Sequence, residues 1–229
     1  MAWLVRTWNV FHGNTVPPGR RAYLEEMVRL AAADGPAVVC LQEVPAWAVG
    51  RLAGWSGMTA VGEVAAHPRL RSAELGRLIT DLDHGLFRSA FTGQANAVLV
   101  DVALDVARKA EEQVSTSGER RVCQVLTIDG LGAVANVHIT GGAPAAEQLR
   151  RAVGFAEDAA GEGPLIFCGD FNLTPPYAAL DGYSAAAPGI DQVLVRGLPA
   201  ATPLVWPPER RRAGGRLLSD HAPVDVLVG

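Results

Sequence analysis

The sequence predicts an α/β fold, because short apolar runs typical of buried strands alternate with segments of helical periodicity. Residues 37–41 and 165–168 are apolar throughout, as expected of strands that are buried on both faces. Residues 24–31 instead carry apolar side chains at helical spacing, namely Leu24, Met27, Val28 and Ala31. The 229 residues suffice for one large domain and contain no linker-like tract, so we expect a single domain over residues 1–229.

The composition is that of an ordinary globular protein, with 49% hydrophobic and 19% charged residues. A net charge of −4 creates no global basic field that would attract nucleic acid, so only a local basic patch could do so. Cys40 and Cys168 lie in apolar runs, which predicts reduced, packed thiols in a reducing compartment. Arg6 interrupts the N-terminal apolar residues before they could form the core of a signal peptide, and no apolar run approaches the ~18 residues of a membrane span. We therefore expect a cytoplasmic protein.

In the first half of the chain, two predicted strands end in polar residues. Residues 2–10 alternate like a strand and end at Asn9, and a loop with several Gly and Pro residues follows. A helix then extends to about Ala33, where Gly35 and Pro36 end it. Residues 37–43 form the second strand, which finishes in Glu43. The other elements expected in this half are a short helix at 45–52, a strand at 58–64, a helix at 71–82, and a strand at 97–100 that residues 102–109 either prolong or pair with.

The second half of the chain is predicted to open with a β-hairpin. Asp129 and Gly130 form a turn signal between strands at 122–128 and 133–139, after a loop at 111–121. Asn136 and His138 lie two residues apart on the second strand and therefore share one face. The elements expected after this hairpin are an amphipathic helix at 144–160 with Leu149, Ala152, Val153 and Ala156 inward, strands at 165–170, 190–195 and 222–228, and a long loop with four Pro at 199–218.

The strand at 165–170 ends in a carboxylate, Asp170, and Asn172 follows two residues later. A carboxylate and a carboxamide at the rim of a sheet suit a hard cation or a phosphate, although a simple Asp-Asn turn explains this segment alone equally well. Polar residues in similar settings elsewhere favour the functional interpretation. The full set at strand ends is Asn9, Glu43, Asn136, His138, Asp170, Asn172, Asp191, Asp220 and His221.

Each of these residues also has a purely structural interpretation. Asn9 is typical of a turn at a strand end, Glu43 of a charge at a helix start, and His138 of a core histidine with satisfied nitrogens. Asp191 could cap a turn, and Asp220 with His221 could form the polar rim of the last strand. We interpret Asn136 as structural rather than catalytic. The joint occurrence of the set carries the functional hypothesis.

Six short motifs contain the whole of this set: TWNV (residues 7–10), LQE (41–43), NVHI (136–139), GDFN (169–172), IDQVL (190–194) and SDHAPV (219–224). In this order, and over nearly the whole chain, they resemble the motifs of the endonuclease/exonuclease/phosphatase superfamily, the relatives of DNase I. The resemblance implies a four-layer α/β sandwich, in which two mostly antiparallel sheets pack face to face with helices outside. It also implies an active site at one rim of the sandwich, where the strand ends converge.

The resemblance implies a divalent cation, Mg²⁺ or Mn²⁺, with Glu43 as the principal ligand and Asn9 and Asp220 completing or bordering the site. Carboxylate oxygens suit Mg²⁺, which takes few protein ligands and keeps several waters. Hydrolysis of a phosphate ester needs such a cation to neutralise non-bridging oxygens, a base for the attacking water, and donors for the developing charge.

The same resemblance assigns the base and the donors. Asp170 orients or deprotonates the attacking water. His221 contacts the phosphate or acts as the base, and Asp191 holds its tautomer by accepting a ring N–H. His138 is a second phosphate donor or a general acid, and Asn172 donates to the phosphate. The residues implied to bind the phosphate are Asn96, Asn172, His138 and His221.

We therefore predict a divalent-metal-dependent phosphoesterase that hydrolyses phosphodiester bonds, either a nuclease or a small-molecule or lipid phosphodiesterase. We expect a monomer that acts on a phosphate ester, with nucleic acid among the candidate partners. The alternatives are a phosphomonoesterase of the same superfamily and a non-catalytic binding protein that retains the fold. The second alternative predicts lost ligands, whereas Glu43, Asp170, Asp220 and His221 are all present.

The run Arg210-Arg211-Arg212 lies in the loop that enters the expected rim before Asp220, so it could contact substrate phosphates, and Trp206 could stack on a base. The alternative is a solvated charge run with a Trp that anchors the loop. The superfamily often carries an Arg or Lys soon after the metal-binding Glu, whereas this chain has Val-Pro-Ala-Trp at residues 44–47. This departure argues against DNA-backbone binding of the nuclease type.

Overall fold

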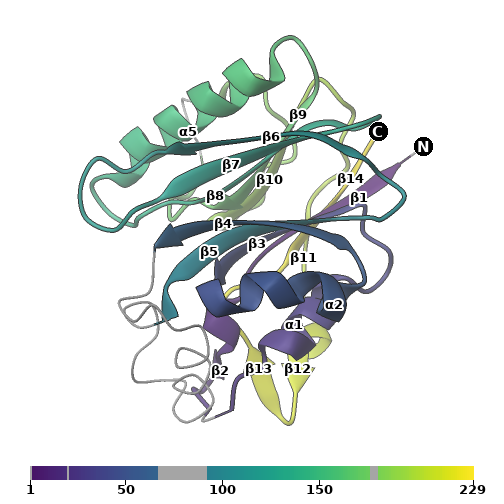
Figure 1. Ribbon diagram of the computed structural model, residues 1–229, viewed down its shortest axis with the longest axis vertical. Helices are drawn as coiled ribbons and strands as arrows, with labels where there is room; N and C mark the ends of the chain where they lie inside the picture. Colours follow the sequence, from purple (N-terminus) through teal and green to yellow (C-terminus); the bar gives the residue numbers. More distant parts are fainter. Residues whose placement is uncertain (1, 20, 67–91, 176–179) are drawn as a thin grey trace.

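The computed structural model describes residues 2–19, 21–66, 92–175 and 180–229, and its main feature is a pair of β-sheets packed face to face (Figure 1). The six-stranded sheet has the order β11 (Leu204–Val205), β14 (Val224–Val228), β1 (Trp3–Asn9), β3 (Val38–Val44), β5 (Gln94–Val100) and β4 (Thr59–Ala66). The five-stranded sheet has the order β10 (Asp191–Arg196), β9 (Leu165–Asp170), β8 (Gly132–His138), β7 (Val122–Ile128) and β6 (Val106–Gln113). A small sheet contains β12 (Arg212–Ala213), β13 (Arg216–Leu218) and β2 (Thr15–Val16).

Helices cover the outer face of both large sheets, so the layers run helix, sheet, sheet, helix (Figure 1). Helix α5 (Ala145–Ala160) lies on the five-stranded sheet. On the six-stranded sheet lie α1 (Leu24–Ala31), α2 (Leu52–Ser56) and the 3₁₀ segment η2 (Ala46–Arg51). The four-layer α/β sandwich predicted from the sequence is therefore confirmed.

The buried side chains follow the period-two alternation of the strands. On β8, Val134 contributes to the core between the sheets, whereas Ala135 contributes to the core beneath α5. The predicted inward face of α5 is also confirmed, because Leu149, Ala152, Val153 and Ala156 are all buried there. Both sheets are thus apolar on both faces, which explains the continuous apolar runs in β3 and β9.

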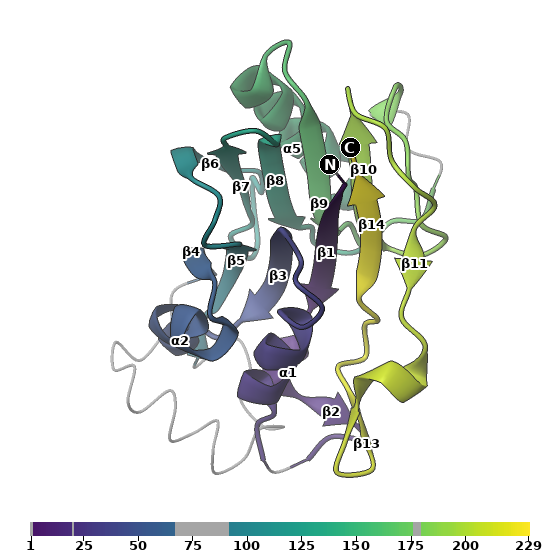
Figure 2. The ribbon, with the colours of Figure 1, turned by 90° about the vertical axis from the view of Figure 1, so that its right-hand side faces the viewer.

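Strand direction brings the polar strand ends to one rim of the sandwich. The parallel strands β1 and β3 end at this rim, as do the parallel strands β8 and β9 of the other sheet. Strands β5, β10 and β14 run antiparallel to these neighbours and therefore begin at the same rim. Figure 2 shows β14, β1 and β3 side by side in the six-stranded sheet.

Gly169 allows β9 to approach β8 one residue before the rim. Its φ is +148°, and a Cβ atom built there would lie 2.0 Å from the carbonyl oxygen of Val137. Any side chain at position 169 would therefore push β9 away from β8 and displace Asp170. Glycine before Asp170 is therefore required for the packing of β9 against β8, and it is also part of the motif.

Three predictions for irregular or ambiguous segments are wrong. Residues 102–109 neither prolong β5 nor pair with it, because β6 begins at Val106 and pairs with β7 in the other sheet. The predicted loop at 111–121 is shorter, since β6 continues to Gln113. The predicted loop at 199–218 contains β11, the 3₁₀ segment η4 (Pro208–Arg211), β12 and β13. The helix predicted at 71–82 lies outside the described residues.

Trp206 anchors the segment between β11 and η4. Its ring is 2% exposed, and its Nε1 donates to Asp225 Oδ2 at 2.8 Å. Asp225 also accepts two bonds from the buried Arg6 at 2.6 and 2.9 Å, and the Arg6 guanidinium lies 4.4 Å from the Trp206 ring centroid. A side chain this buried cannot offer its face to a base, so the anchoring interpretation is confirmed and the stacking interpretation is wrong.

None of the described helices is long and apolar enough to cross a membrane.

Candidate active site

Asn9 links the two carboxylates that end β3 and β9. Its Nδ2 donates to Glu43 Oε1 at 3.1 Å and to Asp170 Oδ2 at 3.0 Å, while its own Oδ1 accepts the N–H of Phe11 at 2.9 Å. The two carboxylates come from different sheets, so this amide holds the sandwich closed at the rim. Glu43 adopts a φ of +55° at the β-bulge of β3, which turns its side chain away from the regular alternation.

Burial raises the pKa of both carboxyl groups. For Glu43, burial is the main cause, and the hydrogen bond from Asn9 opposes it. For Asp170, burial and then the charge of Asp191 raise the pKa to about 6, against the opposing effect of His221 and the Asn9 bond. A carboxylate with a pKa near 6 is a stronger base than an exposed one and is still mostly ionised at neutral pH.

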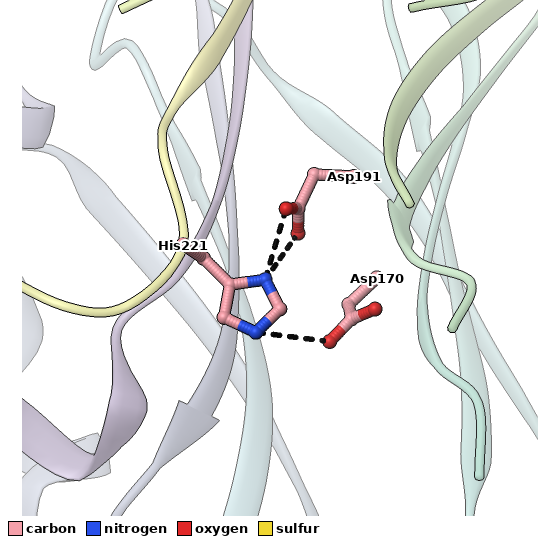
Figure 3. Close-up of side chains that lie close together, drawn as sticks. All are labelled: Asp170, Asp191 and His221. Carbon is pink, nitrogen blue, oxygen red and sulfur yellow. Dashed lines mark hydrogen bonds and ion pairs between the residues drawn. The ribbon is translucent and has the colours of Figure 1, made fainter. Parts of the chain in front are cut away.

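Asp191 and His221 form the hydrogen-bonded pair that the motifs predict. His221 Nδ1 lies 2.9 and 3.0 Å from the two Asp191 oxygens, and Nε2 of the same ring lies 3.8 Å from Asp170 Oδ2 (Figure 3). Burial alone would lower the pKa of His221, but the hydrogen bond and charge of Asp191, with Asp170 and Asp220, raise it to about 9. The ring is therefore positively charged at neutral pH, and it directs Nε2–H toward Asp170.

His138 has the opposite electrostatic environment, because its ring meets an arginine. Arg121 Nη1 lies 2.8 Å from His138 Nδ1, and the other ring nitrogen, Nε2, lies 3.5 Å from Asp170 Oδ2 and 3.8 Å from Glu43 Oε1. Burial, and then the charge of Arg121, lowers the pKa of His138 well below its usual range. His138 is thus neutral at neutral pH, which suits a phosphate donor, and its role as a donor or as a general acid stays a prediction.

Asp220 and Asn172 occupy the outer part of the site. The Asp220 side chain is 45% exposed and lies 4.0 Å from His221 Nε2. Asn172, with a φ of +47°, donates Nδ2 to the Ile139 carbonyl at 2.8 Å, and its backbone N–H donates to Asp170 Oδ1 at 2.9 Å. One Nδ2 bond goes to the backbone, so the amide retains a second N–H for a ligand.

Asn96 and Asn136 lie deeper in the sandwich. Asn96 Nδ2 donates to the Val122 carbonyl at 2.8 Å, which bridges β5 and β7. Asn136 donates to the carbonyls of Leu41 and Ala97 at 3.0 Å each, and both it and its partners are fully buried. The structural interpretation of Asn136 is therefore confirmed, while phosphate binding by Asn96 stays a prediction.

His12 belongs to the site although the motifs did not include it. Its Nε2 lies 3.4 Å from Glu43 Oε2, and the residue is 4% exposed. It lies in the 3₁₀ segment η1 (Phe11–Gly13), with a φ of +54°. Its position three residues after Asn9, at the same strand end, was the available signal in the sequence.

The Arg210 to Arg212 run supports the fold more than it faces a ligand. Arg210 Nη2 pairs with Asp34 at 2.5 Å, and its guanidinium stacks 3.6 Å from the Trp206 ring centroid. Arg211 is buried and donates Nη1 to the carbonyls of Leu218 and Ser219 at 2.9 and 2.8 Å. Only Arg212 is exposed. The prediction of a phosphate-binding run is thus wrong for Arg210 and Arg211, and the solvated-run alternative holds for Arg212 alone.

The donor set at the rim fits a hard divalent cation. Among the described residues, no Lys or Arg lies within ion-pair distance of Glu43, Asp170 or Asp220, and the cationic groups there are histidines. The negative charge and oxygen donors of these three carboxylates match the preference of Mg²⁺ or Mn²⁺. Asp170, Asp191 and His221 place one potential ligand atom each within 4.8 Å of one another, but Asp191 and His221 are already bonded to each other as a charged pair. Glu43 carries no such pair, because its oxygens meet only Asn9 and two histidines among the described residues, and the predicted cation site at Glu43, Asp220 and Asn9 stays a prediction.

A pocket of about 450 Å³ borders the site at Asp191, Asp220 and His221. Its other lining residues are apolar or glycine: Pro188, Gly189, Ile190, Val205, Ala222 and Val224. A larger pocket of about 610 Å³ lies between α1 and α2 and includes none of the predicted site residues. Of these two pockets, the one beside His221 borders the candidate site.

Comparison with known proteins identifies a family. A sequence model of the Endonuclease/Exonuclease/phosphatase family matches residues 7–221, which include every predicted site residue. No curated protein sequence matches the chain significantly.

Many solved structures share this fold, and the three described below are distant from this chain in sequence. An endonuclease/exonuclease/phosphatase from Bacteroides vulgatus superposes with a TM-score of 0.73 at 13% identity, over 100% of this chain and 99% of its own. The mannosyl-6-phosphatase Bt3783 of Bacteroides thetaiotaomicron VPI-5482 gives 0.68 at 14% identity, over 99% and 100%. The catalytic domain of human Nocturnin, with a bound sulfate anion, gives 0.69 at 16% identity, over 100% and 94%. These likenesses establish the fold.

Proposed function

Because the chain belongs to the endonuclease/exonuclease/phosphatase family, whose members hydrolyse phosphate esters, we propose that it hydrolyses phosphodiester bonds in a reaction that depends on a divalent cation. The observation that carries this proposal is the convergence of Glu43, Asp170, Asp191 and His221 at one rim, where Asn9 bonds to both Glu43 and Asp170 and where His221 bonds to Asp191. In a protein that had lost catalysis, no function would select for a base, a charged histidine and an uncompensated carboxylate at one place.

Glu43, with Asp220 and Asn9 at its border, would hold Mg²⁺ or Mn²⁺. The bound cation would supply neutralisation of charge on the non-bridging phosphate oxygens. The remaining chemistry belongs to the side chains of this chain. Asp170 orients and deprotonates the attacking water, since burial raises its pKa to about 6 and Asn9 and the Asn172 N–H fix both of its oxygens.

The two histidines and Asn172 would stabilise the charge that develops on the phosphate. His221 contributes a positive charge because Asp191 holds it protonated, and His138 contributes a neutral Nε2–H. Asn172 contributes the amide N–H that the Ile139 carbonyl leaves free. Donors fixed by the fold before the substrate arrives stabilise a transition state without reorganisation at the moment of reaction.

The pocket beside His221 supports a diester over a monoester. A diester carries an organic group on each of two phosphate oxygens, and the pocket of about 450 Å³ offers space for one of them. A phosphomonoesterase is the second candidate, because one structural neighbour of the chain is a mannosyl-6-phosphatase. A nucleic acid remains among the candidate substrates.

We also propose that the chain acts as a single domain and a monomer in the cytoplasm. Val5 and Val228, near opposite ends of the sequence, share the core between the sheets, which supports one folding unit. Cys40, Cys123 and Cys168 are all free and buried, as expected in a reducing compartment.

The test is a hydrolysis panel with bis-p-nitrophenyl phosphate, p-nitrophenyl phosphate, plasmid, single-stranded DNA, RNA and sphingomyelin, with and without EDTA. We expect a diester to be cleaved, EDTA to abolish cleavage, and added Mg²⁺ or Mn²⁺ to restore it. Asp170→Asn should lower kcat by about 10³–10⁴-fold. A variant that keeps more than about a tenth of kcat contradicts the role of Asp170. Preferred cleavage of p-nitrophenyl phosphate favours the monoesterase, and no cleavage at all favours the non-catalytic alternative.

Calorimetry tests the cation site independently of turnover. Wild type should bind Mn²⁺ or Mg²⁺. Glu43→Gln should abolish this binding or lower its affinity at least tenfold, since the substitution removes the charge of the principal ligand. Glu162→Gln is the matched control, because Glu162 is exposed and lies outside the site. An unchanged affinity of Glu43→Gln for the cation would contradict the assignment of Glu43 as its principal ligand.

A further inference from the structure

Arg121 is a polar residue that contacts the site and that no motif includes. It lies immediately before β7, is 8% exposed, and directs all three guanidinium nitrogens to defined partners. Nη1 meets His138 Nδ1 at 2.8 Å, Nη2 donates to Glu119 Oε2 at 3.0 Å, and Nε donates to Thr140 Oγ1 at 3.3 Å. The side chain is thus held rigidly with one N–H aimed at the imidazole.

The guanidinium decides which nitrogen of His138 carries the proton. Arginine has only N–H donors and stays protonated in proteins, so the ring nitrogen that faces it must accept. Nδ1 is therefore the unprotonated nitrogen, and the single ring proton lies on Nε2. Nε2 is the atom that faces the rim, at 3.5 Å from Asp170 Oδ2 and 3.8 Å from Glu43 Oε1.

The other tautomer is excluded by repulsion. A proton on Nδ1 would place an N–H against the N–H of Arg121, with both groups buried and no alternative acceptor for the ring among the described residues. It would also leave Nε2 as a lone pair that faces two carboxylates. His221 meets a carboxylate instead, so His138 and His221 are oriented by partners of opposite charge.

We infer that Arg121 is a positioning residue for catalysis, which fixes the His138 tautomer so that Nε2–H points to the phosphate of the substrate. This inference rests on the proposed function. His138 then acts as a hydrogen-bond donor to a phosphate oxygen, and it transfers no proton. Arg121 contacts neither Glu43 nor Asp170, although its charge lowers the pKa of Glu43, and its direct contact with the site is the one to the His138 ring.

The first test reads the tautomer directly and needs no activity. In long-range ¹H–¹⁵N spectra of metal-free protein labelled at histidine, His138 should show Nδ1 at the shift of an unprotonated nitrogen and Nε2 at the shift of a protonated one. Arg121→Met removes the donors at similar length and should convert this pattern to a mixture of tautomers. A proton on Nδ1 in the wild type overturns the inference, whether or not any variant folds.

The second test separates positioning from structural support by kinetics on bis-p-nitrophenyl phosphate. Arg121→Met should lower kcat by about 10–100-fold with KM changed less than about threefold, as for other residues that orient a site group. In a His138→Ala background the same substitution should have almost no further effect, because its target is gone. Equal losses in both backgrounds show that Arg121 acts elsewhere and overturn the inference.

Two further variants guard against general damage. Glu119→Gln removes the negative charge of the Nη2 partner but leaves the Arg121 to His138 contact, so it should keep the wild-type tautomer and kcat within about threefold. Arg121→Lys retains one donor and should recover part of the kcat lost in Arg121→Met. If the wild type cleaves none of the panel substrates while the tautomer is as inferred, the proposed function has failed and the orientation of His138 by Arg121 still stands. If Glu119→Gln loses as much kcat as Arg121→Met, the loss comes from disturbance of the loop that carries Glu119 and Arg121, and the inference is overturned.

Discussion

At the scale of single residues, neighbours decide the charge of two similar side chains. His221 and His138 both direct Nε2 toward Asp170 Oδ2, at 3.8 and 3.5 Å. Burial lowers the pKa of each ring, but Asp191 reverses this effect for His221, whereas Arg121 adds to it for His138. The site therefore holds one positively charged and one neutral imidazole at neutral pH. A donor of each kind suits a phosphate, whose charge grows and spreads during the reaction.

Replacement of Asp191 by Asn should remove the positive charge of His221 near neutral pH. The folded-state pKa of His221 is about 9, above the value of ~6.5 expected in the unfolded chain. The pair therefore stabilises the metal-free protein fully below about pH 6.5, and the stabilisation is lost as the pH rises through about 9. Asp191→Asn should lose this pH dependence and lower the His221 pKa below 7.

An NMR titration of the His221 ring, with urea unfolding at pH 6, 8 and 10, measures both effects on metal-free protein. Asp129→Asn is the control, because Asp129 is exposed in the turn between β7 and β8. A His221 pKa that stays near 9 in Asp191→Asn would show that Asp170 and Asp220 hold the proton without Asp191.

At the scale of elements, the turn that carries Asp220 and His221 is held by contacts remote in sequence. Ser219 has a φ of +59°, its Oγ donates to the Asn9 carbonyl at 2.7 Å, and its N–H donates to the Asn14 carbonyl at 3.0 Å. Arg211 adds two bonds to the carbonyls of Leu218 and Ser219. Because Ser219 is in a strained conformation, the turn depends on these partners to place His221 beside Asp170.

Arg211 and Arg212 are neighbours in sequence but should differ in their effect on stability and activity. Arg211→Ala leaves two carbonyls without a charged donor and should reduce the free energy of unfolding by about 2–4 kcal/mol. It should also lower kcat, since the turn that holds His221 relaxes. Arg212→Ala, at an exposed position, should stay within about 0.5 kcal/mol of wild type. Urea unfolding and steady-state kinetics of the two variants give the comparison, and equal effects would contradict it.

At the scale of the whole molecule, the sequence predicts the strands and helices of the sandwich because each leaves a local pattern, whereas their four-layer arrangement is implied by the resemblance of the six motifs to the family. Continuous apolar runs indicate β3 and β9, the i, i+3, i+4 pattern indicates α1 and α5, and the Asp129-Gly130 turn indicates the β7–β8 hairpin. Strand ends also predict the site, since direction within a sheet brings Asn9, Glu43, Asp170 and Asp191 to one rim. The family and the α/β sandwich follow from these two kinds of signal.

The features that sequence reasoning missed depend on partners far along the chain. The strand β13 pairs with β2, about two hundred residues earlier, and such pairing leaves no mark in a loop rich in Pro and Arg. Likewise, β6 pairs with β7, although its polar alternation suits an edge strand of either sheet. Arg121 was missed because it is defined by the side chain it meets, His138, and no spacing rule connects the two. The position of His12, three residues after Asn9, was a signal that the motifs did not use.

Asn136 connects the two sheets directly behind the site, and its loss should weaken the whole sandwich. It extends from β8 to the carbonyls of Leu41 and Ala97, and its Oδ1 accepts from Gln42 Nε2 at 2.7 Å. Asn136→Ala creates a cavity and leaves these buried groups with fewer partners, which should cost about 2–4 kcal/mol. For a chain of this size that corresponds to a fall in Tm of about 5–15 °C.

A second cross-sheet amide provides the matched control. Gln124 on β7 extends toward β4 and donates to the Val61 carbonyl at 3.0 Å, but its Oε1 is buried without a partner among the described residues. Gln124→Met loses one bond and removes one unsatisfied acceptor, so the free energy of unfolding should change by less than about 1 kcal/mol. Calorimetric Tm values and urea unfolding of Asn136→Ala and Gln124→Met measure the difference. Equal destabilisation by the two substitutions would mean that all polar bridges between the sheets are equivalent. A loss of stability confined to Asn136→Ala means that the hydrogen-bond network behind Glu43 and His138 holds the sandwich closed at the rim.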